Sequence, residues 1–551
     1  MATIRQQARE KIGWDHDEGD GASYERVKAV FQAAHEALRP GAPFHPQVLG
    51  PDEEWEVPTP LVFESHRGFV GRAIVLLKRR VLFPLNRWLH SYTWHNLRRQ
   101  QKLNLLLLSA VESLAVSHAR LAREMEDLRA RGPQPDPEVE PFADKVESFR
   151  GESDRRMKVA FVVDRYGADV PGGSERHCRE FAERLAKRGH EVTVLTSCAR
   201  DYVTWANAYA AGATEDGEIT VLRFPVAAER NQEDFRDRSR RVFAGLGTEE
   251  DERAWFQANG PYVPTLVEHL RTNGETFDLV IFFSYRYYPT FFGLPLVASR
   301  AILVPTAEED PAIRLGVLRK FFTLPAGIVH NTQEEQELIR SVTRGPLPAF
   351  EVIGSGVDEP GASPAASRLE GLGVRRPFIL CLGRVDPNKG SVELLSHFRR
   401  FVEHEGERVQ LVLAGEAVLD VQAQRGVLVL GRVTEEERAA LLHHMVALVA
   451  PSPFESLSLA LIEAWMVGRP ALVNGWCKAL KGQVNRADGG LYYENAVEFL
   501  EALRFLLDEP ATAERLGLQG LAHARENYAW PVVMNRLEEF LLARLSSRGG
   551  G

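Results

Sequence analysis

Cysteine is scarce in this chain. The 551 residues contain four cysteines, with no Cys-x-x-Cys pair and no cluster of cysteine with histidine: Cys178, Cys198, Cys381 and Cys477. Structural zinc sites need such close ligand sets, and small secreted folds held by disulfides are much richer in cysteine. The sequence therefore predicts a protein of a reducing compartment without structural zinc.

Long apolar runs and a secretory leader are also missing. The first residues alternate basic and polar side chains, and the longest apolar run beside a basic region, residues 105–111, is about a third of what a bilayer needs. The net charge is −9 and the isoelectric point is near 6.0, so there is no global excess of positive charge for nucleic acid. We expect a cytoplasmic chain of about two to four domains that binds no nucleic acid.

One internal segment lacks acidic residues. Residues 65–111 contain no aspartate or glutamate but nine basic side chains, interleaved with apolar ones such as Phe69, Trp88 and Trp94. Such a segment can lie peripherally on an anionic membrane surface, where each basic residue contributes about 1 kcal/mol. The alternative is a pair of basic helices packed on the acidic remainder of the protein. Both interpretations remain open at this point.

The rest of the first 156 residues divides into three short regions. Residues 1–60 are acidic and rich in proline, which predicts a disordered tail, and the Asp15-His16-Asp17 triplet within it is no metal motif. Within residues 61–132, the basic amphipathic region, leucine recurs every seventh position from Leu107 to Leu128. This pattern predicts either a short coiled coil between copies of the chain, a homo-oligomer, or one helix packed internally. Residues 133–156 resemble a linker in composition.

From residue 157 the pattern changes to alternating strands and helices. Short apolar runs followed by amphipathic segments predict a doubly wound α/β architecture with parallel strands. The expected strands lie at residues 159–163, 191–196, 219–226, 279–283, 301–304 and 328–331, and again at 378–382, 410–414, 427–430, 448–450, 471–473 and 490–493. We expect one Rossmann-like domain over residues 157–350, a second over 351–525, and a last helix over 526–545.

Glu455 and Glu463 are the most informative pair in the sequence. Glu455 lies in a loop after an apolar strand, and Glu463 lies eight residues later on the following helix. Two carboxylates placed in this way can face one ligand from two directions, and a carboxylate holds paired hydroxyls well because each oxygen accepts a charge-assisted hydrogen bond. Sugars and riboses carry such hydroxyls.

This strand–loop–helix stretch resembles the donor-binding motif of the retaining family-4 glycosyltransferases. The resemblance covers roughly residues 157–545 and implies the GT-B fold, in which two Rossmann-like domains face a cleft. It implies that Glu455 contacts the donor sugar and Glu463 the ribose. The family usually has Gly-Phe-Gly after the first Glu; here Ser456, Leu457 and Ser458 take these positions, which leaves the choice of donor in question.

Gly383, Arg384 and Lys389 form a second constellation, after the first strand of the second domain. Two cations at the carboxyl end of a strand can neutralise the charge that grows on a leaving nucleoside diphosphate. Family-4 enzymes place an Arg and a Lys in the same Gly-Arg…Lys-Gly frame. The resemblance therefore implies a catalytic role for Arg384 and Lys389 and a donor contact for Gly383.

Two further turns carry weaker signals. Gly172 and Gly173 open a helix after the first strand, where free N–H groups and close backbone approach suit a donor phosphate; the alternative is a purely structural turn in which Ser174 caps the helix. Gly415 and Glu416 end another strand and resemble family positions beside the nucleotide base.

Glu308 follows a first-domain strand where related transferases often carry a histidine. This departure leaves the catalytic base open; Glu308 or Asp310 can orient the acceptor hydroxyl. Lys481 and Gln483, after a later strand, are candidate sugar contacts or parts of a surface turn.

Together these patterns predict a retaining glycosyltransferase that moves a sugar from a nucleotide-sugar donor to a glycan or a lipid-linked glycan precursor. No cofactor or divalent metal is implied, and the family's usual account has the donor phosphate assist deprotonation. Two alternatives are an inactive GT-B protein that binds nucleotide sugars or acts as a scaffold, and another GT-B enzyme such as an epimerase or a phosphorylase.

Overall fold

The structure, a computed structural model, describes residues 156–170, 172–419 and 421–548. The predicted tail, the basic segment, the leucine heptads and nearly all of the predicted linker lie outside the described residues.

The first half of the described chain forms an eight-stranded sheet of order β3-β4-β2-β1-β5-β6-β7-β8. Neighbouring strands are parallel except for β3, which pairs antiparallel with β4 at one edge. The strands are β1 (Lys158–Val162), β2 (Glu191–Ser197), β3 (Gly212–Asp216), β4 (Ile219–Phe224), β5 (Leu279–Phe283), β6 (Ala301–Val304), β7 (Gly327–His330) and β8 (Ala349–Val352).

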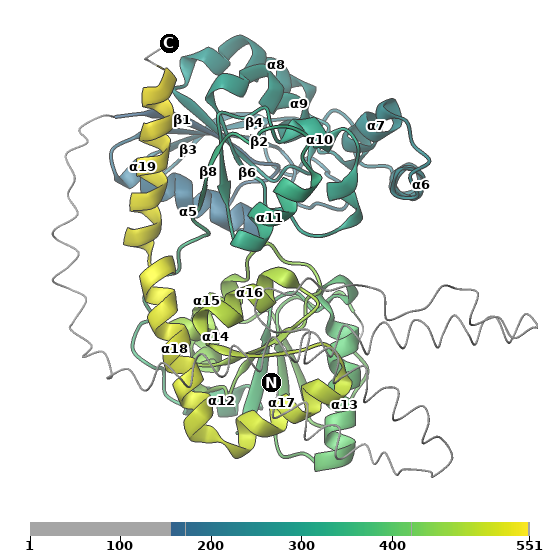
Figure 1. Ribbon diagram of the computed structural model, residues 1–551, viewed down its shortest axis with the longest axis vertical. Coiled ribbons are helices and arrows are strands. Elements are labelled where there is room, and N and C mark those ends of the chain that lie inside the picture. Colours follow the sequence, from purple (N-terminus) through teal and green to yellow (C-terminus); the bar gives the residue numbers. More distant parts are fainter. Residues whose placement is uncertain (1–155, 171, 420, 549–551) are drawn as a thin grey trace, which may run out of the picture. The chain divides into compact units, whose positions relative to one another are not determined.

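Helices cover both faces of this sheet. They are α5 (Gly173–Lys187), α6 (Gln232–Phe243), α7 (Glu249–Asn259), α8 (Pro264–Asn273), α9 (Tyr288–Gly293), α10 (Leu318–Phe321) and α11 (Gln333–Val342), with short 3₁₀ turns η4 (Gly274–Thr276), η5 (Leu294–Arg300) and η6 (Pro311–Arg314). One face packs against α5 and the last helix, α19 (Trp530–Arg548), where Phe181 meets Trp530 edge-on with ring centroids 6.2 Å apart. Figure 1 shows α19 in yellow beside the teal strands of this sheet.

The second half forms a six-stranded, all-parallel sheet of order β11-β10-β9-β12-β13-β14. Its strands are β9 (Phe378–Leu382), β10 (Gln410–Ala414), β11 (Val427–Gly431), β12 (Leu448–Ala450), β13 (Ala471–Asn474) and β14 (Gly490–Tyr493). Its helical elements are α12 (Ser367–Gly371), η7 (Pro387–Lys389), α13 (Ser391–Glu405), α14 (Glu435–His444), α15 (Leu459–Met466), α16 (Lys478–Ala487), α17 (Ala496–Asp508) and α18 (Pro510–Tyr528).

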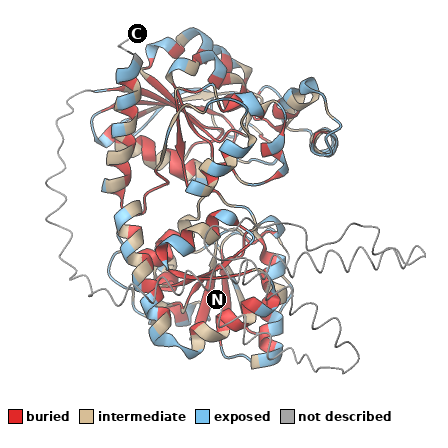
Figure 2. Ribbon diagram, in the orientation of Figure 1, coloured by how far each residue is buried: buried red, intermediate tan, exposed pale blue. Residues whose placement is uncertain are grey.

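The strands are the buried layer of both sheets. In Figure 2 they are mostly red, while the outward faces of the helices are pale blue. Every residue of β5, β6, β7, β10, β13 and β14 is buried. Strands buried on both faces appear in sequence as short continuous apolar runs, which is why most of them were predicted within one or two residues.

Two edge strands were missed. All five residues of β3 (Gly-Ala-Thr-Glu-Asp) are exposed, and β8 has no fully buried residue. An edge strand with a solvated face has no apolar run to reveal it. The doubly wound α/β expectation is confirmed, with the antiparallel β3 as an addition to it.

Candidate active site

The predicted site residues lie at the carboxyl ends of strands in both sheets. Glu308 follows β6, Arg384 follows β9, and Glu455 follows β12. In open α/β sheets ligands bind in the crevice outside these strand ends. The fold therefore places these side chains where a ligand of either sheet would lie.

A cation links two of the predicted side chains. Lys389 Nζ donates a hydrogen bond to Glu455 Oε1 over 2.8 Å, and both side chains are partly buried. Burial lowers the pKa of Lys389, but the charges of Glu455 and Glu308 outweigh it, so that the pKa is raised and the lysine is a cation at neutral pH. Lys389 therefore pairs with Glu455 and also interacts electrostatically with Glu308.

Glu308 is one of several carboxyl groups of the first domain whose pKa is raised. Burial raises its pKa to about 7, with Lys389 opposing the shift and Glu455 adding to it. A carboxylic acid with a pKa near 7 can accept and return a proton at neutral pH. Glu308 thus has the charge environment of a general base or acid.

The loop that carries Glu308 is held in a strained backbone conformation. Thr306 has a φ of 46°, a left-handed value that a β-branched residue rarely adopts. The next residue is fixed by a buried carboxylate, because Ala307 N donates to Glu335 Oε1, while Asn331 N donates to Glu335 Oε2 over 2.5 Å. Burial raises the pKa of Glu335 to about 8. Glu335 therefore holds the segments after β6 and β7 together.

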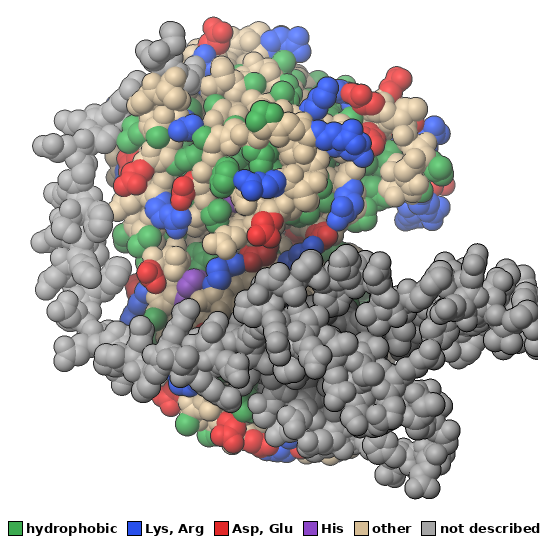
Figure 3. Space-filling view, viewed as in Figure 1, with side chains coloured by type: hydrophobic (Ala, Val, Ile, Leu, Met, Phe, Trp, Pro, Cys, Tyr) green, Lys and Arg blue, Asp and Glu red, His purple; other side chains and the backbone are tan. Residues whose placement is uncertain are grey.

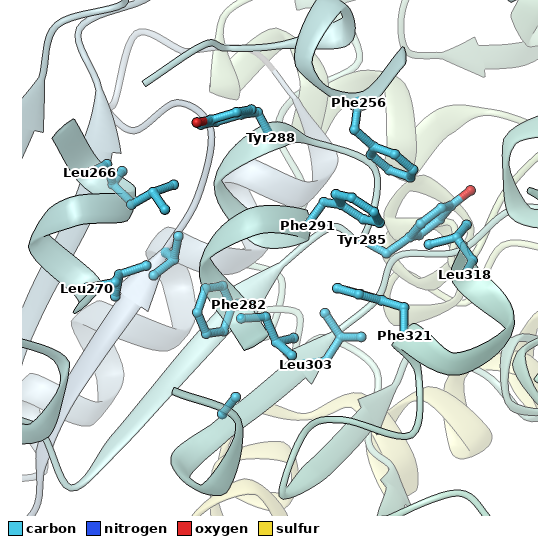
Figure 4. Packing of buried hydrophobic residues seen from close by; sticks show 14 of the residues in the cluster. Phe256, Leu266, Leu270, Phe282, Tyr285, Tyr288, Phe291, Leu303, Leu318 and Phe321 are labelled. Carbon is cyan, nitrogen blue, oxygen red and sulfur yellow. The ribbon is translucent and has the colours of Figure 1, made fainter. Parts of the chain in front are cut away.

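An aromatic cluster lies beside the loop after β6 that carries Glu308. Phe256 and Phe291 stack with centroids 3.8 Å apart, and Figure 4 shows them beside Tyr285 and Phe321. Tyr285 OH donates to Asp310 over 3.3 Å, and Asp310 also accepts from the backbone N–H groups that open η6. Asp310 pairs with Arg286 as well, at 2.6 Å. These contacts make Asp310 a structural anchor of the loop.

Glu463 is held by two arginines. Arg176 Nη1, on α5, donates to Glu463 Oε1 over 3.2 Å, and Arg438 Nη2, on α14, donates to Oε2. Glu463 is 5% exposed. A ribose hydroxyl would have to share or replace one of these partners. Neither arginine was predicted, although Arg176 lies only three residues beyond Gly173 on the helix that begins at the ligand edge.

The three residues that replace the usual glycine motif each have a structural contact. Ser456 Oγ accepts a hydrogen bond from Asn331 Nδ2 over 3.1 Å, which joins the second sheet's loop to the first sheet. Leu457 packs against the second-domain core, and Ser458 caps α15 by accepting from Leu461 N over 3.3 Å. Their side chains thus shape the loop that carries Glu455.

Arg384 is positioned by two residues, Asp386 and Tyr202. Its Nε lies 3.0 Å from Asp386 Oδ2, its Nη1 donates to Tyr202 OH over 2.6 Å, and its guanidinium stands 5.3 Å from the centre of the Tyr202 ring. Tyr202, which belongs to the first half of the chain, was not predicted, because an isolated surface tyrosine gives no sequence signal.

Some glycines at these strand ends leave no room for a Cβ, and others do. Gly415 has a φ of 149°, and a Cβ there would lie 2.0 Å from the carbonyl oxygen of Gly383, so only glycine lets these two strand ends touch. Gly172, at φ 154°, would clash with the Glu175 carboxylate, whereas a Cβ at Gly173 meets nothing within 4 Å. Glu416 is half-exposed and pairs with Arg432 at 2.5 Å.

Two minor expectations are corrected. Gly172 rather than Ser174 occupies the N-cap position of α5, and no side chain caps the helix. Gln483 is fully buried, which contradicts its prediction as a sugar contact. Lys481 donates to Glu494 over 2.9 Å, and its role as a sugar contact stays a prediction.

Basic and acidic side chains are interspersed on the face of the described residues that Figure 3 displays. Residues 156–170, 172–419 and 421–548 contain no group of three or more His, Cys, Asp or Glu arranged to hold a metal ion. In the same part of the chain, no helix combines the length and the apolar character needed to cross a bilayer.

Comparison with protein families decides the class. Residues 171–359 match the model described as Glycosyltransferase Family 4, and residues 376–509 match Glycosyl transferases group 1. The chain belongs to the family-4 glycosyltransferases. The two matches contain every predicted site residue of this glycosyltransferase, with Glu308 in the first and Glu455 in the second.

Curated relatives agree with this assignment. The glycosyltransferase is 24% identical over 421 residues to the glycogen synthase of Mycobacterium tuberculosis, which covers 70% of this chain and 95% of that protein. It is 25% identical over 401 residues to the phosphatidyl-myo-inositol mannosyltransferase of the same organism, and the match covers 69% of this chain and 95% of that protein.

Solved structures establish the same fold. The sucrose-phosphate synthase of Thermosynechococcus elongatus aligns with a TM-score of 0.56 at 17% identity, covering 71% of this chain and all of that one. The HepE protein of Anabaena, in complex with UDP-glucose, aligns with a TM-score of 0.52 at 16% identity, and the alignment covers 71% of this chain and 100% of that one. The glycosyltransferase thus has the GT-B fold, as the sequence predicted.

Proposed function

We propose that this glycosyltransferase moves a sugar, with retention of its anomeric configuration, from a nucleotide-sugar donor to a glycan or a lipid-linked glycan precursor. The observation that carries the proposal is the cluster of Glu308, Lys389 and Glu455 at neighbouring strand ends of the two sheets. It combines a cation for a leaving phosphate, a carboxylate for sugar hydroxyls and a carboxyl group that titrates near neutral pH.

The donor is assigned mainly to the second sheet. Arg384 and Lys389 stabilise the charge that develops on the diphosphate as the bond from sugar C1 to phosphate oxygen breaks. Glu455 accepts hydrogen bonds from the donor sugar, and Glu463 accepts them from the ribose after exchanging one arginine. Two fixed cations at the diphosphate are the reason that we assign no metal ion to the step.

The acceptor is assigned to the first sheet. Its hydroxyl oxygen forms the new bond to C1 on the face from which the diphosphate leaves, and its proton passes to Glu308 or to a diphosphate oxygen. The loop that presents Glu308 is fixed by Glu335, which suits a group that must meet the reacting atoms at a defined distance.

Binding of the donor is the first test of this proposal. Thermal unfolding of the full chain would be followed with UDP, GDP, ADP and TDP and with their hexose conjugates. At least one should raise the melting temperature, because a ligand that binds only the folded state stabilises it. If none does, the chain has no nucleotide-sugar site and the proposal fails.

We also propose that residues 65–111 attach the enzyme to anionic membranes. The support is sequence alone: nine positive charges, no negative ones and interleaved aromatic residues. The full chain should sediment with anionic vesicles, less so at high salt, while a shortened chain that begins near residue 155 should not. Equal behaviour of the two chains would leave the segment as an internal helical or oligomerisation region.

A further inference from the structure

A cavity of about 250 Å³ lies in the first domain between α6, α7 and the segment that follows β4, and its lining residues differ from those assigned to the donor and to proton transfer. Figure 1 shows α6 and α7 next to each other. The buried Trp205 lines the cavity together with small residues, Ala228, Ala254 and Gly260, which leave the space open. The volume equals that of about eight water molecules in the liquid. It therefore suits a small ligand rather than a nucleotide sugar.

Arg230 contributes a partly buried guanidinium to this cavity. Its Nε donates to the carbonyl oxygen of Asn259 over 2.9 Å, its Nη1 to that of Tyr202 over 2.8 Å, and its Nη2 to Asn259 Oδ1 over 3.0 Å. In the described part of the chain, no carboxylate forms an ion pair with it. Burial lowers the pKa of Arg230 to about 10, so the group is still a cation at neutral pH. The cavity thus contains a positive charge that only neutral oxygens contact.

The guanidinium is held in a fixed orientation. It stands 5.1 Å from the centre of the Trp205 ring and 4.7 Å from that of Phe235. A guanidinium has five N–H donors, and the bonds to Asn259 and Tyr202 leave an N–H of Nη1 for a ligand when the described residues are counted. Because the group is positioned before a ligand arrives, little side-chain entropy is lost on binding.

The other charges of the cavity do not compensate Arg230. Arg238 pairs with Asp234 at 2.8 Å, so these two neutralise each other. Glu229 is exposed, and water screens its charge. Gln257 adds a neutral amide. The guanidinium therefore decides which ligand fits, and the groups that pair best with a guanidinium are phosphates and carboxylates.

We propose that this cavity is a binding site for a small anion, a phosphate or a carboxylate, held by Arg230. The site goes beyond the proposed function and does not depend on it. Tyr202 joins the two sites, because its carbonyl oxygen accepts from Arg230 and its hydroxyl accepts from Arg384 over 2.6 Å. The anion is either free in solution or a group carried by a sugar, and the experiment separates these sources.

Isothermal titration calorimetry of the full chain with inorganic phosphate, citrate and glucose 6-phosphate tests the site. At least one of these anions should bind to the wild type. Arg230→Gln removes the charge and should weaken binding by about ten-fold or more. Ala254→Leu fills the cavity while keeping Arg230, and it should have the same effect even if Arg230→Gln disturbs the fold. The matched control is Arg253→Gln, which alters an exposed arginine of α7 that pairs with Glu249 at 3.1 Å and should bind as the wild type does.

Arg384→Ala separates this cavity from the donor site, where a phosphate can also bind. Binding that persists in Arg384→Ala supports the cavity, and binding that is lost only there overturns it. No heat from any of the three anions on the wild type, or unchanged affinity in both Arg230→Gln and Ala254→Leu, also overturns it. Binding of phosphate or citrate identifies a free anion as the ligand, whereas binding of glucose 6-phosphate alone identifies an anionic sugar. The thermal screen with nucleotides tests the donor site independently, so failure of one proposal is distinct from failure of the other.

Discussion

The carboxyl ends of the strands, where a ligand would bind, are lined by different kinds of residue in the two sheets. At the second sheet, backbone comes close to backbone, because a Cβ at Gly390 would lie 2.2 Å from the carbonyl oxygen of Pro451 and one at Gly415 would lie 2.0 Å from that of Gly383. At the first sheet, carboxyl side chains are buried or partly buried instead. Burial raises the pKa of Asp164 and of Glu308 to about 7 and that of Glu335 to about 8.

This difference indicates a division of labour. A glycine-lined edge lets a phosphate approach the backbone and two fixed cations closely. Buried carboxyl groups with a pKa near 7 suit the transfer of a proton from a hydroxyl. The contrast fits a donor held by the second sheet and an acceptor activated by the first.

The largest effect is expected at the second edge. Arg384→Ala and Lys389→Ala should each lower kcat by about 10²–10³, because they remove charge that stabilises the leaving diphosphate in the transition state. Melting temperatures should change little, since partly exposed cations contribute little to folding. Steady-state kinetics and thermal unfolding of both variants provide the measurement.

Arg425→Ala is the matched control for these variants. Arg425 is exposed, belongs to the same domain and pairs with Glu407 at 3.1 Å, away from the glycine-lined edge. It should turn over at the wild-type rate. Normal turnover in both Arg384→Ala and Lys389→Ala would show that the diphosphate does not bind at this edge.

The second-largest effect is expected at Glu308, at the carboxyl ends of the strands in the first sheet. If Glu308 accepts the acceptor proton, kcat should rise with pH through about 7, because only the ionised carboxylate is a base and burial raises its pKa to that value. Glu308→Gln should lower the plateau by about 10² and remove this rise. A pH profile of kcat for both proteins provides the measurement.

Glu250→Gln, an exposed carboxylate on α7, serves as the control and should keep the wild-type profile. A Glu308→Gln profile that retains the wild-type rise would transfer the role of base to the donor phosphate. The first sheet would then bind the acceptor without supplying the general base.

The sequence predicts residues of local motifs and misses those that act through long-range contacts. Gly383, Arg384, Lys389, Glu455 and Glu463 occupy local frames of a few residues after buried strands, so local motifs indicate them as candidate site residues. Glu335, Arg438 and Tyr202 act through contacts with residues 28, 25 and 182 positions away. No local pattern predicts such pairs. The strained φ of Thr306 depends on packing and is equally invisible in the sequence.

The two carboxylates of the motif should separate binding from transfer. Glu463→Ala should weaken nucleotide binding, because we assign Glu463 to the ribose. Glu455→Ala should mainly lower turnover, because we assign Glu455 to the donor sugar. Loss of a hydrogen bond to a charged group should cost about 1.5–3 kcal/mol. Calorimetric titration with the nucleoside diphosphate found in the thermal screen, together with kcat, measures both. Wild-type values in both variants would refute the assignment.

The smallest effect concerns the contact between the two halves at Glu463. Arg176, from the first half, is 40% exposed on its side chain and lies 3.2 Å from Glu463, whereas Arg438, from the second, is 19% exposed. If ribose replaces Arg176, then Arg176→Ala should tighten nucleotide binding by up to about five-fold, since a partly exposed ion pair contributes about 0–1 kcal/mol. Arg438→Ala should instead lower the melting temperature, because it removes the more buried partner of a buried carboxylate. Weaker nucleotide binding in Arg176→Ala would mean that the first half of the chain contacts the donor directly, which would contradict the assignment of the donor to the second sheet.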